Sequence, residues 1–179
     1  TDKSGGDRTY FDVARAGFER DPFRTDNPFV VKTPFLCDQL DDVLQSGIEI
    51  SHLLIPVRRL EEAAESRRYV QRQTTGRADG AAVAGGLWGT DVGQMQESVL
   101  AEKFIRLVEA ATRNDISMTF LSFPRFARDA EYSFRKLRFL LPLMRFERFR
   151  ATFDSCVNPE LVHDFGQQGS LPDQGTSQG

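Results

Sequence analysis

The sequence predicts an α/β protein with three layers, in which helices cover both faces of a mainly parallel sheet. Short apolar segments typical of strands alternate along the chain with longer segments whose apolar residues recur at helical spacing. This alternation is typical of βαβ units, whose crossovers are nearly always right-handed and whose strands run parallel. The predicted strands are mostly apolar, as expected when both faces of a sheet are covered.

Three segments are predicted as strands. Residues 28–34 (PFVVKTP) stop at Pro34, because the residue before a proline avoids the helical region. Residues 49–57 (EISHLLIPV) carry Pro56 near their end, where the loss of one backbone hydrogen bond is tolerated. Residues 116–123 (ISMTFLSF) form the third strand.

Five longer segments are predicted as helices from their apolar spacing. They are residues 35–47, 59–73, 91–115, 127–142 and 145–157. Gly47 is a suitable C-cap for the first of them. The second has two acids in its first turn and arginines toward its end, as the helix dipole favours. One short helix, residues 10–20, is predicted in the polar N-terminal part.

A single domain is predicted over residues 1–165, because a chain of 179 residues can bury one substantial core. Residues 166–179 have too little apolar surface to offset the entropy lost on ordering, so a disordered tail is expected. Residues 74–90 are rich in glycine and alanine and are long enough to form a mobile loop or lid.

Composition excludes several classes of protein. A net charge of −3 gives no reason to expect nucleic acid or an anionic membrane as a partner. No apolar run reaches the roughly 18 residues that span a bilayer. Cys37 and Cys156 have no CxxC spacing, which argues against a zinc site or a disulfide framework and favours a reducing, cytoplasmic compartment. The chain has no initiating Met and no signal-peptide pattern, so a fragment or a processed product is expected.

Each predicted strand carries a cation at or just past its carboxyl end: Lys32, then Arg58 with Arg59, then Arg125. Ligands of open parallel sheets bind beyond these ends, where the N-terminal amides of the next helix also attract anions. Arginine offers a planar fork that suits phosphate or sulfate, whereas lysine offers a point charge. The simpler interpretation is that these side chains only reach solvent, as most lysines and arginines do.

Ser66 lies eight residues after Arg58, on the helix that Arg58 opens. The two residues are roughly 12 Å apart along the helix axis, so the Arg58 backbone and Ser66 are too far apart to contact the same phosphate oxygen. The long Arg58 side chain could fold back over the helix, and both residues could then hold one phosphate. The alternative for Ser66 is an exposed helix serine.

Three segments resemble the sulfotransferase family. LLIPVRRLEEAAES (53–66) is similar to the segment that binds the 3′-phosphate of 3′-phosphoadenosine 5′-phosphosulfate, where a strand ends in arginine and a serine follows on the next helix. VVKTP (30–34) resembles the family's strand that ends in Lys-Thr or Lys-Ser-Pro and faces the sulfuryl group. MTFLSFPRFARDAEYSFRKLRFLLP (118–142) resembles its late strand and the following helix. The order and approximate spacing agree over residues 28–142, and the bacterial branch is the most similar.

The resemblance implies a fold of the P-loop superfamily and a sulfuryl transfer from the phosphosulfate nucleotide to an acceptor, either an alcohol or an amine. Arg58 and Ser66 would hold the 3′-phosphate, and Lys32 would stabilise the charge that develops on the bridging oxygen. Thr33 and Arg125 would complete the nucleotide-binding edge. No metal is required by this mechanism.

Sulfation of a hydroxyl needs a general base. His163, Asp38 and Asp26 are the candidates, and the sequence does not decide between them. His163 stands beside Asp164, but side chains adjacent in sequence rarely face each other. His52 lies inside a predicted strand and is expected to pack or to form a local hydrogen bond.

The chain also departs from the family. The family's first strand and its P-loop should precede the VVKTP segment by some tens of residues, yet the KSGG sequence at 3–6 follows no apolar strand. Pro34 stands where the cytosolic branch has a base histidine, and the C-terminal Gly-rich loop has no counterpart. These differences favour an alternative: a diverged or truncated member that serves in protein interaction or assembly. A sheet that lacks its first strand would expose an edge and favour a homo-oligomer.

Overall fold

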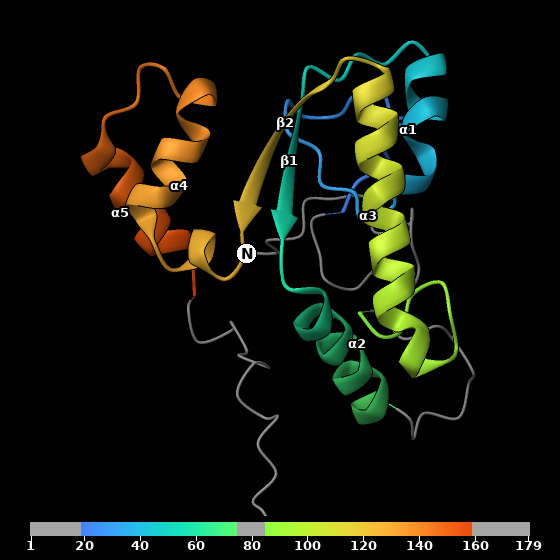
Figure 1. The fold of residues 1–179 in the computed structure, drawn as a ribbon. Helices are drawn as coiled ribbons and strands as arrows, with labels where there is room; N and C mark the ends of the chain where they lie inside the picture. The colour runs from blue at the N-terminus through green and yellow to red at the C-terminus, as the bar shows by residue number, and fades with distance from the viewer. Residues whose placement is uncertain (1–18, 75–84, 159–179) are drawn as a thin grey trace, which may run out of the picture.

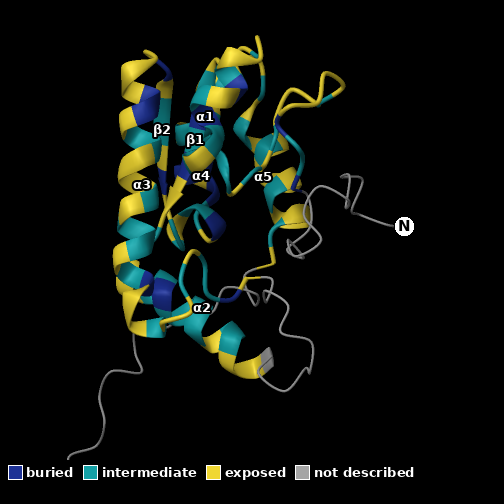
Figure 2. Cartoon of the chain, turned by 90° about the vertical axis from the view of Figure 1, so that its right-hand side faces the viewer, coloured by how far each residue is buried: buried dark blue, intermediate teal, exposed yellow. Residues whose placement is uncertain are grey.

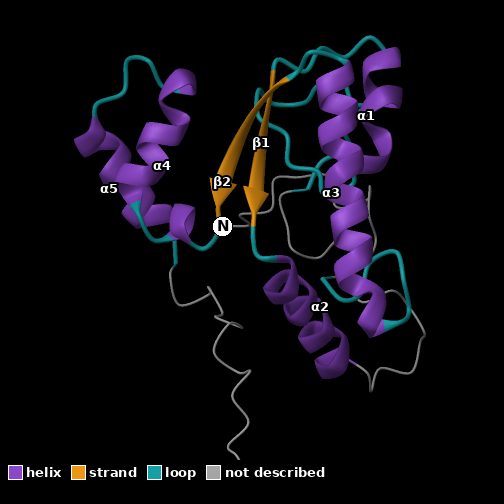
Figure 3. Ribbon diagram, viewed as in Figure 1, coloured by secondary structure: helices purple, strands orange, loops and turns teal. Residues whose placement is uncertain are grey.

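The computed structural model describes residues 19–74 and 85–158 and shows a mixed α/β chain (Figures 1 and 3). Its helices are α1 (Leu36–Gln45), α2 (Leu60–Thr74), α3 (Gln96–Arg113), α4 (Ala130–Leu137) and α5 (Phe146–Cys156). Three short 3₁₀ segments are η1 (Gly93–Met95), η2 (Arg125–Ala127) and η3 (Arg138–Leu140). The α/β class is therefore confirmed, although the described sheet is smaller than predicted.

The sheet has two parallel strands, β1 (His52–Val57) and β2 (Ser117–Ser122). In the register, Val57 lies opposite Ser122, so both strands end at the same edge. The pairing continues one residue further, because the Phe123 amide donates to the Val57 carbonyl at 2.7 Å. The connection through α2 and α3 is the crossover expected of a βαβ unit.

The strand predicted at residues 28–34 is wrong, because these residues lie outside the sheet. Only Lys32 makes a strand-like contact, an isolated parallel bridge with Glu19. Two prolines, Pro28 and Pro34, remove backbone donors from this seven-residue segment, and this weakens any ladder that it could form. The apolar residues of the segment are not buried: Phe29 is 85% exposed.

The core lies between one face of the sheet and two helices, α1 and α3 (Figure 2). Leu53 and Ile55 project from β1 into this layer, and Leu40 of α1 is only 2% exposed. Ala110 and Ala111 of α3 are small, which lets the helix approach α1 and the sheet closely. Packing of these apolar side chains fixes the position of β1, and hence the position of the residues that follow it.

The opposite face of the sheet is contacted by η3, and α4 contacts the end of β2. Adjacent strand residues point to opposite faces, so His52 faces away from the core that Leu53 joins. The ring of Phe139 in η3 stacks on the His52 ring with centroids 4.1 Å apart. At the other end of the sheet, the Tyr132 hydroxyl of α4 accepts from the Ser122 amide at 2.8 Å.

The predicted helices are present within a few residues, except for the segment 127–142. Asp129 caps α4, because its Oδ1 accepts from the Tyr132 amide at 2.9 Å, so the helix starts later than predicted. It then tightens into η3 before Pro142. Gly47 follows α1 with φ of +86°, the left-handed conformation that the C-cap prediction required.

Several predictions lie outside the described residues: most of the helix at 10–20, the KSGG segment and the tail at 166–179. Among the helices that are described, none combines the length and the apolar content needed to cross a bilayer.

Candidate anion-binding site

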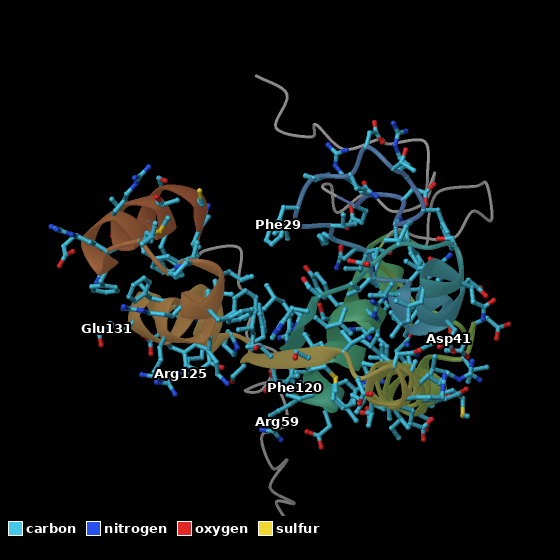
Figure 4. All side chains as sticks on the ribbon, turned by 90° about the horizontal axis from the view of Figure 1, so that it is seen from above. Phe29, Asp41, Arg59, Phe120, Arg125 and Glu131 are labelled. Carbon is cyan, nitrogen blue, oxygen red and sulfur yellow. The ribbon has the colours of Figure 1, made fainter. Side chains whose placement is uncertain are left out.

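The carboxyl ends of β1 and β2 bring two of the predicted cations to one edge of the sheet. Arg58 directly follows Val57, and Arg125 lies in η2, shortly after the end of β2. The hydrogen bond from Phe123 to Val57 holds the two chain exits side by side. Figure 4 shows Phe29 well apart from Arg59 and Arg125. The segment 28–34 is not a strand of the described sheet, so it adds no strand end to this edge.

Arg58 is a partly buried cation, with 16% of its side chain exposed. Its Nε donates to Glu62 Oε2 at 3.2 Å, and Glu62 is equally shielded. The guanidinium also lies over the ring of Phe123, 4.9 Å from the centroid. A carboxylate on α2 and the aromatic ring of Phe123, the residue after β2, therefore orient this side chain together.

Ser66 lies on α2, one turn beyond Glu62, and is half-buried. In the structure the Arg58 side chain contacts Glu62, which lies one turn before Ser66 on the helix. Glu62 is nearer and charged, so it is the stronger acceptor for the guanidinium. The spacing of four residues from Arg58 to Glu62 is visible in the sequence, but this ion pair was not predicted. Binding of one phosphate by Arg58 and Ser66 together stays a prediction.

Lys32 and Thr33 lie in the loop before α1, and not at the end of a sheet strand. Lys32 Nζ forms an ion pair with Glu19 Oε1 at 2.6 Å, and the Glu19 side chain is only 7% exposed. The buried Thr33 Oγ1 has no hydrogen-bond partner among the described residues. The prediction that three strands each bring a cation to one edge is therefore wrong, because Lys32 does not follow a strand of the described sheet. Within residues 19–74 and 85–158, the cations at this edge follow the ends of two strands, β1 and β2.

Arg125 is held on the surface of η2 and α4. Its Nε donates to Asp129 Oδ2 at 3.1 Å, and its guanidinium lies 4.5 Å from the centroid of the Tyr132 ring. The Tyr132 amide and, next, Arg125 hold the pKa of the Asp129 carboxyl below its ordinary value. Tyr132 itself is buried and fixed to β2 through Ser122, so Arg125 has a defined place beside the strand end.

The candidate bases differ in their surroundings. His163 lies outside the described residues. Asp38 accepts from Lys103 Nζ at 2.6 and 2.7 Å. A hydrogen bond from Arg24 lowers the pKa of Asp26, which makes this carboxylate a weaker base. The expectation for His52 is confirmed: its Nε2 lies 2.8 Å from Thr119 Oγ1, and its ring packs locally.

A second cluster surrounds Trp88, which lies in the segment 74–90 that was predicted as a mobile loop or lid. The ring meets Phe35 edge-on at 5.8 Å, and the Arg67 guanidinium lies 5.1 Å from its centroid. Lys103 Nζ lies 5.7 Å from the same centroid. Burial lowers the pKa of the Arg67 guanidinium. The ring thus joins α2 and α3 to the start of α1.

Gln96 holds the backbone of Trp88 from both sides. Its side chain is fully buried; Oε1 accepts from the Trp88 amide at 2.7 Å, and Nε2 donates to the Trp88 carbonyl at 3.2 Å. Arg67 also donates to the Gly86 carbonyl at 2.9 Å. Residues 86–88 are therefore anchored, while the remainder of the predicted lid, 75–84, lies outside the described residues. A glutamine in an amphipathic helix gives no signal that could have identified this partner.

The described residues were also searched for metal-binding clusters, and the chain was compared with known proteins. In the two described ranges, no group of three His, Cys, Asp or Glu side chains could hold a metal ion. Comparison of the chain with protein-family models, curated proteins and solved structures found no match in any of the three.

Proposed function

We propose that the edge formed by the ends of β1 and β2 binds a 3′-phosphorylated adenine nucleotide, and that the protein is a sulfotransferase-like enzyme. One observation carries this proposal. A parallel βαβ unit puts Arg58 directly after β1 and Ser66 two turns later on the crossover helix, in the spacing of the family that the sequence resembles. Ligands of open parallel sheets gather at this edge, beyond the strand ends.

The surroundings of Arg58 support a phosphate as its ligand. Its contacts with Glu62 and Phe123 keep the guanidinium close to the strand end and shield most of it from water. An ion pair in such a place is less screened than one at the surface. A phosphate with two or three accessible oxygens offers the fork a bidentate partner and can compete with Glu62 for the guanidinium.

The reaction proposed is a sulfuryl transfer. The acceptor oxygen or nitrogen forms a bond to sulfur, the bond from sulfur to the phosphate oxygen breaks, and adenosine 3′,5′-bisphosphate leaves. A base takes the acceptor proton, and His163 is our candidate. Lys32 would stabilise the leaving oxygen, which requires that it leave Glu19 and approach the edge. Thr33 and Arg125 would contact the nucleotide, within the three-layer fold that the sequence predicts.

Calorimetric titration tests the proposal with two nucleotides. We expect saturable binding of adenosine 3′,5′-bisphosphate and much weaker binding of adenosine 5′-monophosphate, because Arg58 and Ser66 are assigned to the 3′-phosphate. Arg58→Ala should weaken binding of the bisphosphate by about 1.5–3 kcal/mol, the scale of a charged hydrogen bond. Arg113→Ala is the control, since Arg113 pairs with Asp41 at the end of α3.

Equal affinity for the two nucleotides, or an unchanged affinity in Arg58→Ala, would refute the assignment. If binding is found, transfer of labelled sulfuryl groups to a panel of alcohols and amines would identify the acceptor class.

The second candidate function is an interaction or assembly module without catalysis. It is favoured by the position of Lys32, which is paired with Glu19 away from the edge, and by the exposed Phe29 and Val30 beside it. Each strand of the described sheet has one strand neighbour, and the outer edge of β1 could pair with another chain, whereas Tyr132 already bonds the Ser122 amide at the outer edge of β2. This candidate would be supported if the folded chain does not bind adenosine 3′,5′-bisphosphate but forms a dimer in sedimentation experiments.

A further inference from the structure

The loop that joins η3 to α5 encloses an apolar pocket that the proposed nucleotide site does not use. The pocket has a volume of about 530 Å³, within the range of small-molecule sites, and is open to solvent. Its apolar lining includes Leu140, Leu141, Leu143 and Met144. Leu143 is 96% exposed, so the described residues leave this apolar surface uncovered.

Two arginines are among the residues that line this pocket. Arg145 and Arg148 both line it and are exposed, and neither forms an ion pair within the described part of the chain. Arg150 on the same helix differs, because it is paired with Asp154 at 3.0 Å. Glu147 lies between the two arginines in sequence but does not line the pocket. The lining therefore carries two positive charges and no carboxylate.

The pocket is separate from the edge that carries Arg58. Phe139, which immediately precedes the pocket residues, stacks on His52, the first residue of β1. Arg58 follows the last residue of the same strand. Figure 1 likewise shows the loop between α4 and α5 at the end of the sheet opposite to the arrowheads. A ligand in this pocket would thus not compete with a nucleotide at the strand ends.

We propose that this pocket binds a single-chain anionic amphiphile, such as a fatty-acid carboxylate. The hydrocarbon chain would lie against the leucines and Met144, where its burial is favoured by the hydrophobic effect. The anionic head would lie between Arg145 and Arg148, which can each donate two hydrogen bonds to a carboxylate. A neutral ligand would leave the two guanidinium groups without a counter-charge, so the head group decides affinity.

Calorimetric titration with decanoate, below its micelle concentration, tests the proposal. We expect one site per chain, and binding that is about tenfold weaker for 1-decanol, which has the same chain length without charge. The double variant Arg145→Gln/Arg148→Gln should lose about tenfold in affinity for decanoate. Arg150→Gln is the matched control and should bind as the parent does. Leu143→Ser should weaken binding without affecting the fold, because Leu143 is 96% exposed among the described residues.

Absence of saturable decanoate binding by the folded chain would overturn the proposal, as would equal binding by the parent and the double variant. Cosedimentation with phospholipid vesicles distinguishes binding of a single amphiphile from docking on a membrane surface. If the chain cosediments with vesicles of anionic phospholipid but does not bind decanoate, the loop is a membrane-docking surface and the pocket assignment is wrong.

Discussion

Arg58 shows how a single side chain can be both a structural partner and a candidate ligand. Its pair with Glu62 has the spacing of one helical turn, and both members are mostly shielded from water. Phe123 covers another side of the guanidinium. An anion at the strand ends must therefore compete with an intramolecular carboxylate, and the affinity of the site depends on that competition.

Glu62→Gln tests this competition directly. Removal of the carboxylate should weaken one contact that competes for the guanidinium and remove a negative charge near the phosphate, so we expect binding of adenosine 3′,5′-bisphosphate to strengthen by about 1 kcal/mol. Glu61→Gln is the control, because Glu61 pairs with Arg59 and is well exposed. Titration of the two variants side by side gives the comparison. A weaker affinity in Glu62→Gln would mean that Glu62 positions Arg58 for the ligand and does not oppose it.

Gln96 is the residue on which the position of Trp88 depends most. Gln96→Ala would remove both hydrogen bonds to the Trp88 backbone from a fully buried place. We expect a loss of about 1–3 kcal/mol in the free energy of unfolding, together with a change in tryptophan fluorescence. Gln73→Ala, at an exposed place on α2, should change stability by less than about 0.5 kcal/mol. Equal effects of the two changes in urea titrations would show that Gln96 does not anchor Trp88.

At the scale of elements, α4 owes its start to one carboxylate. Asp129 accepts from the Tyr132 amide, and this bond, followed by the Arg125 contact, lowers the pKa of Asp129 in the folded protein. A lowered folded-state pKa means that the contribution to stability is fully present above the unfolded pKa of about 4 and is lost as the pH falls through the folded value.

Asp129→Ala should therefore lower the melting temperature at pH 7, and the difference from the parent should shrink as the pH falls below about 4. Thermal unfolding followed by circular dichroism over this pH range measures the effect. Asp154→Ala provides a control for the loss of a surface ion pair alone, because Asp154 pairs with Arg150 on the exposed side of α5. A difference that persists unchanged at low pH would show that the cap does not act through its charge.

The elements that local chemistry defines were predicted well. Helix α1 carries its apolar spacing and its terminal Gly47 within its own sequence, and α2 carries its own charge order. The parallel pairing of β1 and β2 was also predicted correctly, because a long helical crossover separates their two apolar runs in the sequence. These properties are set by residues close in sequence, so periodicity and capping suffice to identify them.

Contacts between distant residues were not predictable in the same way. The segment 28–34 has the composition of a strand, yet a strand exists only with a neighbour to pair with, and the sequence could not show that this neighbour is absent from the described sheet. The pair of Lys32 with Glu19 and the burial of Gln96 against Trp88 also depend on tertiary packing. The position of Arg58 at the strand end was predictable; its preference for Glu62 was missed although the spacing indicated it.

For the whole molecule, the central claim is that the end of the sheet is a nucleotide-binding edge. A crystal structure of the chain with adenosine 3′,5′-bisphosphate is the most direct test. We expect the 3′-phosphate within about 2.7–3.2 Å of the Arg58 guanidinium and of Ser66 Oγ, with the Glu62 contact released. A nucleotide bound elsewhere, or crystals grown at saturating nucleotide that show Arg58 still paired with Glu62 and no density at the edge, would contradict the account.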